Sequence, residues 1–206
     1  MTSSLTSLPL YQPSDDKKLA DRIFKTAIDG LLYLDHDVHT DNRGFYSELS
    51  LIPDLEKVIN HPFIIKQINQ SHSAANVVRG FHAEGWNKLV TVITGKALSV
   101  LADTRPDSPT FLNKEYFLLD QSESALDGCL FIASNIANSI CVLEGPVDYL
   151  YCVDTLYRDR DTSGDSAISL FDPDLDIAWP IDKNQMIISD RDRATTTLRK
   201  LYPEKF

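Results

Sequence analysis

His82 and Lys88 are the two side chains whose types and spacing could do chemistry. They lie six residues apart in the segment VVRGFHAEGWNKLVTVITG, residues 77–95. In a strand of period two, Lys88 shares a face with Val90 and Val92, so its ammonium group points toward an apolar side of the sheet. Because burying an unpaired charge costs free energy, Lys88 indicates either a strand end that reaches water or a functional site.

An imidazole and an ammonium group close together could remove a proton from a carbon beside a carbonyl group. We expect His82 on a strand that is joined to the strand of Lys88 by the short loop AEGWN, so that both lie at the mouth of one hairpin. The imidazole would act as general base, and the ammonium group would stabilise the resulting enolate oxygen. Taken singly, each residue also has a plain structural interpretation as a hydrogen-bonded histidine or a solvated lysine.

A metal site is a weaker interpretation of the same segment. Metal sites in β-barrels often use His-x-His followed by a later histidine, and the matching triplet here is His82-Ala83-Glu84. No histidine follows it, and the four others precede it on segments that we expect to be peripheral: His36, His39, His61 and His72. The chain also has no glycine-rich nucleotide motif and no GxSxG or HExxH pattern, so we expect no metal and no cofactor.

The elements that must position these residues are predicted to be mostly strands. Short apolar or alternating runs recur about every ten residues, which favours an antiparallel sandwich or barrel. Residues 89–103 are predicted to form a hairpin with Thr94-Gly95-Lys96 as its turn. The other predicted strands are residues 63–69, 129–133, 140–145 and 147–157, with turn clusters at 105–109 and 158–165.

Two short helices and one extension complete the prediction. Residues 54–60 are predicted to form one or two helical turns before Pro62, and residues 189–203 a short helix that begins at Ser189 and closes at Pro203. Residues 1–22 are rich in Ser, Thr, Pro and charged residues and predict an extension that is either laid on the surface or partly disordered. Residues 23–206 are predicted to form a single domain.

Composition limits the classes of function. The 206 residues are 43% hydrophobic and carry a formal charge of −10, so the chain can bury one core but repels nucleic acids and anionic membranes. The three cysteines, Cys129, Cys141 and Cys152, have no metal-type spacing and are predicted to be reduced. Without a membrane-length apolar run or a signal-peptide pattern, the protein is predicted to be soluble and cytoplasmic.

The motifs, taken in order, identify a resemblance. They are DNRGFYSE (41–48), QINQSHS (67–73), VVRGFH (77–82), NKLVTVITG (87–95), LADTRPDSPTF (101–111), YLYCVDTLY (149–157), DPDLDIAWPI (172–181) and ISDRD (188–192). Over residues 25–200 the chain resembles the dTDP-4-dehydrorhamnose 3,5-epimerases. The resemblance implies an all-β cupin fold, a double-stranded β-helix or jelly roll, with short peripheral helices and a C-terminal helix. It also implies a homodimer that acts without cofactor or metal on a dTDP-linked 4-keto-6-deoxy sugar.

The resemblance also implies the catalytic residues. His82 matches the family's base, Asp192 the carboxylate that orients it, Lys88 the enolate-stabilising lysine, and Tyr151 the tyrosine that delivers a proton from the other face. The C4 ketone acidifies the hydrogens on C3 and C5, so removal and return on opposite faces inverts each centre. Without the resemblance, Asp192 would be interpreted as a helix cap and Tyr151 as a core residue.

Substrate-binding residues follow from the same motifs. Arg79 matches a diphosphate ligand, and Arg43 matches one that reaches across from the partner subunit; the planar fork of arginine suits phosphate oxygens. Four further positions match residues near the sugar or nucleotide: Phe45, Glu48, Gln67 and Asn69.

Three departures from the family pattern leave the substrate open. The loop after His82 is short, Asn138 replaces a second active-site histidine, and Ser99 and Leu156 replace an aspartate and an aromatic residue, although Tyr157 could still stack on the base. Because the four catalytic matches remain, we expect an active epimerase of both centres. The alternatives are epimerisation of a single centre in a related nucleotide-linked sugar, a non-catalytic sugar-nucleotide binding module, and a metal-dependent cupin oxygenase.

Overall fold

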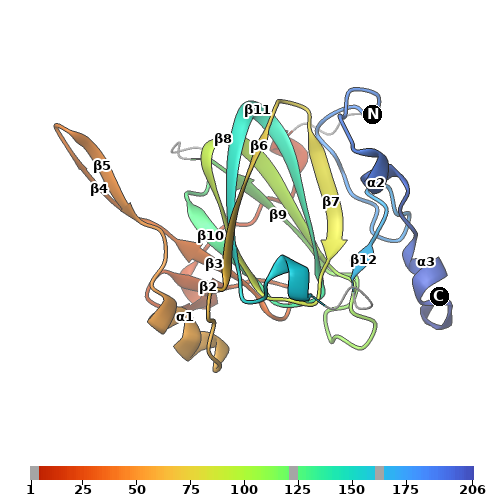
Figure 1. Cartoon of the computed structure of the whole chain (residues 1–206), viewed down its shortest axis with the longest axis horizontal. Coiled ribbons are helices and arrows are strands. Elements are labelled where there is room, and N and C mark those ends of the chain that lie inside the picture. Colours follow the sequence, from red (N-terminus) through yellow and green to blue (C-terminus); the bar gives the residue numbers. More distant parts are fainter. Residues whose placement is uncertain (1–4, 121–124, 161–164) are drawn as a thin grey trace.

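The computed structural model describes residues 5–120, 125–160 and 165–206, and β-strands dominate these residues (Figure 1). The strands are β1 (Lys18–Ala20), β2 (Ile23–Lys25), β3 (Leu31–Asp35), β4 (Asp37–Asp41), β5 (Gly44–Glu48), β6 (Gln67–Ser73), β7 (Val78–Ala83), β8 (Lys88–Asp103), β9 (Lys114–Leu119), β10 (Gly128–Ile132), β11 (Ile136–Val153) and β12 (Ser166–Ala167). The α-helices are α1 (Ile52–Ile59), α2 (Asp190–Arg193) and α3 (Leu198–Leu201), and single 3₁₀ turns cover Leu5–Ser7, Asp15–Lys17, Tyr157–Asp159 and Pro203–Lys205.

The long strands β8 and β11 form the framework of the fold. They pair antiparallel from Lys88 opposite Val153 to Asp103 opposite Ile136, with register shifts near their middles. Gly95 has φ +76 there, and a Cβ atom on it would lie 2.5 Å from the Pro146 carbonyl oxygen, so only glycine fits. The predicted hairpin with its turn at residues 94–96 is therefore wrong, as is the division of β11 into two strands, because turn residues also fit a bend within one paired strand.

The bend divides each long strand between two facing sheets. The first half of β8 and the second half of β11 have β10 and β6 as outer neighbours, and the other halves have β9 and β7. β3, β2 and β1 extend the first sheet beyond β10, and β12 extends the second beyond β7. Every pair of named strands is antiparallel in the described residues. This arrangement confirms the predicted all-β jelly roll.

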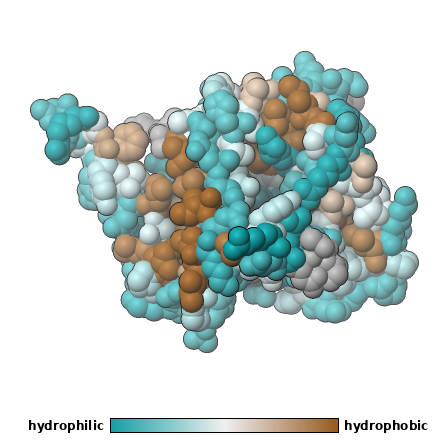
Figure 2. All heavy atoms as spheres, in the orientation of Figure 1, coloured by the Kyte–Doolittle hydropathy of each residue, from teal (hydrophilic) through white to brown (hydrophobic). Residues whose placement is uncertain are grey.

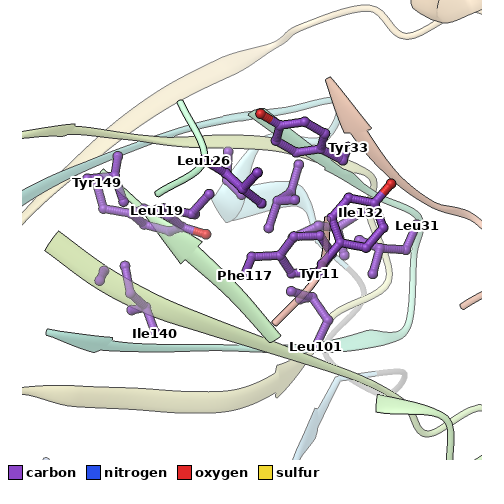
Figure 3. Close-up of a cluster of buried hydrophobic side chains, with 14 of the residues drawn as sticks. Tyr11, Leu31, Tyr33, Leu101, Phe117, Leu119, Leu126, Ile132, Ile140 and Tyr149 are labelled. Atoms are coloured by element: carbon purple, nitrogen blue, oxygen red, sulfur yellow. The ribbon is translucent and has the colours of Figure 1, made fainter. Parts of the chain in front are cut away.

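Alternation along β8 explains how one sequence builds three apolar layers. Val90 and Val92 belong to the cluster between the sheets, which Figure 3 shows, while Leu89 belongs to a cluster under α1. After the bend, Leu101 faces the interior, and Leu98 packs under the C-terminal segment. Because both faces of the strand are covered, most residues of β8 are apolar, and Lys88, the first residue of the strand, lies in a buried position.

The described part of the N-terminal extension contributes to the core, which its composition did not predict. The Tyr11 side chain is buried in the interior cluster, and its N–H donates to the Tyr116 carbonyl at 2.8 Å. Leu8 packs against the outer face of the second sheet. Residues 1–4 lie outside the described residues.

The predicted helices have different outcomes. α1 is present, begins at Ile52, and ends before Asn60, whose φ of 58 is left-handed. The single helix predicted over residues 189–203 is wrong. α2 and α3 are separated because Thr196 makes strand-like bonds, accepting from the Ser169 N–H at 2.8 Å and donating to the Ala167 carbonyl at 3.2 Å.

Other sequence predictions can be compared with the described residues. β6 begins at Gln67, four residues later than predicted, because Phe63 packs under α1. Residues 161–164 of the predicted turn cluster at 158–165 lie outside the residues that the structure describes. The three cysteines are unpaired, as predicted. Within the described ranges, none of the helices has the length and apolar character that crossing a membrane requires.

Candidate active site

A cavity of about 200 Å³ lies between the two sheets, and its walls bring together six of the predicted site residues. These are Arg79, His82, Lys88, Asn138, Tyr151 and Tyr157. Larger hollows of about 470 and 610 Å³ contain none of the predicted site residues, and one of about 390 Å³ on the β4–β5 hairpin contains only Arg43 and Phe45 of them. Chemistry rather than size therefore identifies the candidate active site.

His82 is paired with Asp192 from the C-terminal segment. The His82 Nε2 atom lies 2.8 Å from Asp192 Oδ1, and the Asp192 side chain is 5% exposed. The Asp192 N–H donates to the Ser189 hydroxyl at 3.1 Å, which caps α2. Asp192 therefore occupies the predicted cap position with its backbone while its carboxylate binds the imidazole.

Electrostatics keep the Asp192 carboxylate ionised. Burial raises the pKa of Asp192, but hydrogen bonds and charge from His82, with the Gly80 N–H and the Ser189 hydroxyl, outweigh burial and lower it below its usual value. An ionised partner stabilises an imidazolium ion, so this geometry suits a histidine that accepts a proton.

Replacing Asp192 with asparagine is expected to lower the free energy of unfolding by about 2 kcal/mol near neutral pH, since a charged hydrogen bond is lost. The native pKa is depressed, so the stabilisation is present above the ordinary aspartate pKa of 3.8 and is lost as pH falls through the lower native value. Urea unfolding of both proteins near pH 7 and near pH 3 checks this. A stability difference that is equal at both pH values contradicts it, and the exposed Asp190→Asn on the same helix is the matched control.

Lys88 enters the cavity from the opposite sheet and is paired with Glu84. The Lys88 side chain is 5% exposed and that of Glu84 18%, and their charged groups form a close ion pair. The prediction that His82 and Lys88 lie on the two paired strands of one hairpin is wrong. β11 separates the two strands, since His82 lies opposite Asn138 in its first half and Lys88 opposite Val153 in its second.

Tyr151 lies on the same sheet as Lys88, opposite Val90. Burial raises the pKa of Tyr151, the Glu84 charge raises it further, and Arg79 lowers it. The phenol is therefore protonated at neutral pH and can donate a proton. One sheet supplies His82, and the other supplies Lys88 and Tyr151, so a flat ligand between them would meet proton-handling groups on both faces.

A β-bulge brings Arg79 and His82 to the same cavity. Two residues three positions apart face opposite sides of a regular strand, but here Arg79 lies opposite Ile140 and His82 opposite Asn138, so β7 carries one extra residue. Gly80 makes this possible at φ +133. A Cβ atom there would lie 2.5 Å from the Ser139 Cβ and 2.9 Å from the Asn138 carbonyl oxygen.

Gln67 and Asn69 lie beside the cavity, on β6. Their side chains are bonded to each other at 2.6 Å, and the Gln67 oxygen accepts the Tyr157 N–H at 2.8 Å. The Tyr157 ring is half exposed, and the Arg160 guanidinium group lies 3.7 Å from its centroid. One face of this ring is therefore already covered by a cation.

The remaining predicted residues are far from the cavity within this chain. Arg43, Phe45 and Glu48 belong to the β4–β5 hairpin, which extends away from the body of the protein (Figure 1). Arg43 is 86% exposed and pairs with Asp41 at 2.6 Å. Glu48 pairs with Arg22 at 2.9 Å.

Three ionisable residues of the cavity wall were missed as site residues: Glu84, Tyr149 and Arg191. Each had a local signal. Glu84 shares the period-two face of His82, Tyr149 shares that of Tyr151, and Arg191 directly precedes Asp192. The pattern alone did not show which of these faces line a cavity.

Comparison with known proteins links this geometry to one group of enzymes. The family model described as dTDP-4-dehydrorhamnose 3,5-epimerase matches residues 25–200. The enzyme of that name from Methanothermobacter thermautotrophicus is 31% identical over 185 residues, which cover 87% of this chain and 95% of the relative. The dTDP-4-dehydro-6-deoxyglucose 3-epimerase of Streptomyces bikiniensis is 26% identical over 84% of this chain and 86% of its own.

A solved structure agrees with these sequence relatives. The Legionella pneumophila dTDP-6-deoxy-D-glucose-3,5-epimerase, in complex with dTDP-4-keto-L-rhamnose, has a TM-score of 0.77 and 28% identity. The match covers 89% of this chain and 96% of that one.

Proposed function

The chain belongs to the dTDP-4-dehydrorhamnose 3,5-epimerase family, and from this premise we propose that it inverts both C3 and C5 of dTDP-4-dehydro-6-deoxy-D-glucose to give dTDP-4-dehydro-L-rhamnose. The observation that carries the proposal is the cavity in which the His82–Asp192 pair faces Lys88 and Tyr151. A base on one face of the sugar, a proton donor on the other and a cation near the ketone oxygen are the groups that proton transfer beside a ketone requires.

In the proposed reaction His82 is the base. Its Nε2 bonds to the ionised Asp192, so the neutral imidazole carries its hydrogen there and leaves Nδ1 free to accept a proton. The C–H bond at C3 or C5 breaks, its proton moves to Nδ1, and its electron pair forms the enolate with the C4 oxygen. Asp192 then stabilises the imidazolium ion.

Lys88 and Tyr151 complete the proposed reaction from the other sheet. The Lys88 ammonium group stabilises the enolate oxygen, and Glu84 supports the buried charge. Tyr151 donates its phenolic proton to the carbon on the face opposite His82, and the electron pair returns to that C–H bond. His82 releases its proton to solvent and Tyr151 regains one before the second centre reacts.

Diphosphate binding is proposed for the arginines at the cavity. Arg79 and Arg191 line its wall and are both exposed, so their guanidinium groups can meet phosphate oxygens. This local positive charge allows a protein of net charge −10 to bind an anion. Tyr157 is proposed to stack on thymine, with Gln67 and Asn69 beside it.

Incubation of the purified protein with dTDP-4-dehydro-6-deoxy-D-glucose in heavy water tests the proposal. Deuterium at both C3 and C5 supports it. Deuterium at one carbon supports the second candidate, a single-centre epimerase, which the relationship to the Streptomyces bikiniensis 3-epimerase and the residue Asn138 favour. Binding of dTDP without deuterium at either carbon contradicts both and indicates a binding module.

A homodimer is proposed because the β4–β5 hairpin carries predicted ligand residues away from its own cavity. The chain exposes large apolar side chains on β1, on β6 and on the segments that flank α1; these are Leu19, Leu51, Ile64 and Ile68. Figure 2 shows apolar side chains gathered over this part of the molecule. A second copy that covers this patch would bring Arg43 to the cavity of its partner.

Mixing two inactive variants tests this exchange. Arg43→Ala and His82→Ala homodimers are each expected to be nearly inactive. Subunit exchange creates heterodimers with one site that has both native residues, so mixing is expected to restore activity to about a quarter of wild type. The initial rate before and after mixing measures it. No recovery, with exchange verified by mass spectrometry, contradicts the shared site.

A further inference from the structure

Two polar atoms in the cavity wall are buried without a hydrogen-bond partner among the described residues. They are the Asn138 Oδ1 atom and the Tyr149 hydroxyl oxygen. Tyr149 is only 6% exposed, and both residues line the cavity that contains His82 and Tyr151. Buried polar atoms are normally hydrogen-bonded, so two unpaired ones in a single cavity point to a ligand.

The bend in β11 brings these two residues together. Asn138 lies in the first half of the strand, opposite His82, and Tyr149 in the second half, two residues from Tyr151. The rings of Tyr149 and Tyr151 are 6.2 Å apart. Burial raises the pKa of Tyr149, and weak hydrogen bonding from the nearby Asn138 and Ser99 side chains lowers it. Neither contact has the distance and angles of a regular hydrogen bond, so the phenol is left without a full partner.

Other buried hydroxyl groups near the cavity or in the interior cluster already have hydrogen-bond partners. The Ser99 hydroxyl donates to the Ser139 carbonyl at 3.1 Å, and the Ser139 hydroxyl donates to the Val100 carbonyl at 2.8 Å. Tyr33, which lies in the same interior cluster as Tyr149, donates to Asp35 at 2.7 Å (Figure 3). Core tyrosines of this protein thus have partners where they do not face the cavity.

The chemistry of the two atoms defines the ligand group. The Asn138 oxygen is an acceptor, and the Tyr149 hydroxyl can donate. A hydroxyl group can satisfy both at once, because it donates to the amide oxygen and accepts from the phenol. A ketone or a methyl group cannot donate to the amide oxygen.

We propose that Asn138 and Tyr149 together bind the C2 hydroxyl of the substrate sugar and make the enzyme selective for sugars that carry it. The inference rests on the proposed function. Both residues adjoin the proposed proton-transfer groups, so their ligand lies on the sugar ring next to a reacting carbon. Of the two ring hydroxyls, that on C2 keeps its configuration throughout the reaction, so a fixed pair of side chains can bind it in substrate and product alike.

Removal of the phenolic hydroxyl tests the proposal. Tyr149→Phe is expected to lower kcat/KM for the full substrate by about 10- to 100-fold, since the partner atoms lose a buried hydrogen bond. With the 2-deoxy analogue, wild type and Tyr149→Phe are expected to have equal kcat/KM. Asn138→Ala is expected to change kcat/KM for the two sugars in the same way as Tyr149→Phe. In the double variant, the fold-loss of kcat/KM is expected to be smaller than the product of the two single fold-losses.

A matched control separates this effect from packing. Tyr33→Phe also removes a buried hydroxyl from the interior cluster, but its expected effect is a lower melting temperature with unchanged kcat/KM for both sugars. Wild-type kcat/KM in Tyr149→Phe, or equal losses with both sugars, overturns the proposal. The dissociation constants of the two sugars provide the same comparison, so the hydroxyl site is tested even if wild type incorporates no deuterium.

Discussion

His82→Ala is expected to lower kcat by about 10³-fold while the protein still binds dTDP, because the variant lacks the base that accepts the carbon-bound proton. Asp192 keeps its cap on α2 in the variant, since that contact uses the Asp192 backbone. The binding cations are also unchanged, so the loss is expected in kcat rather than in dTDP affinity. Deuterium incorporation into the dTDP-sugar in heavy water measures kcat, and calorimetry measures dTDP binding.

The control for His82→Ala is another histidine. His61 is exposed and outside the cavity, and its Nδ1 faces the carbonyl of Pro62, so His61→Ala is expected to keep full activity. A His82→Ala protein with more than a tenth of wild-type kcat is incompatible with a base at this position. Loss of dTDP binding in the same protein would assign His82 to the ligand site instead.

Lys88→Met is expected to lower kcat by about 10²- to 10³-fold, because the enolate oxygen loses its positively charged partner. Methionine retains most of the apolar stem, so packing against the interior cluster changes little. The variant also leaves the Glu84 carboxylate, which is 18% exposed, without its ion-pair partner. Breaking a buried pair in this way is expected to lower the free energy of unfolding by about 3 kcal/mol.

A double variant separates the two effects of Lys88. Adding Glu84→Gln to Lys88→Met removes the unpaired charge, so the free energy of unfolding is expected to recover while kcat stays low. Urea unfolding measures the first quantity and the heavy-water assay the second. If kcat recovers together with stability, Lys88 has a structural role and the proposed enolate stabilisation is wrong.

The family and the all-β class could be predicted from the sequence, because both depend on local patterns. Short alternating runs favour an antiparallel sandwich or barrel whichever strands pair with each other. Motifs such as RGFH and NKLV can be recognised from a few adjacent residues. The family motifs predicted His82, Lys88, Tyr151 and Asp192 as site residues. In the structure the first three line one cavity, and Asp192 bonds to His82.

Only the tertiary structure decided how those residues meet. Residues 94–96 have the composition of a turn, and pairing with β11 makes them a bend instead. The bulge at Gly80 moves Arg79 to the side of His82, and that bulge depends on register with a strand almost sixty residues away. The unpaired Tyr149 hydroxyl likewise has no signature in the sequence.

Register is the physical reason for this division. Side chains alternate with a period of two, so a shift of one residue between paired strands exchanges the faces of all that follow. Local sequence determines which residues can face a core, and the pairing of distant segments determines which of them share a cavity. The fold class of this protein therefore follows from its local sequence, whereas its candidate active site depends on how distant segments pair.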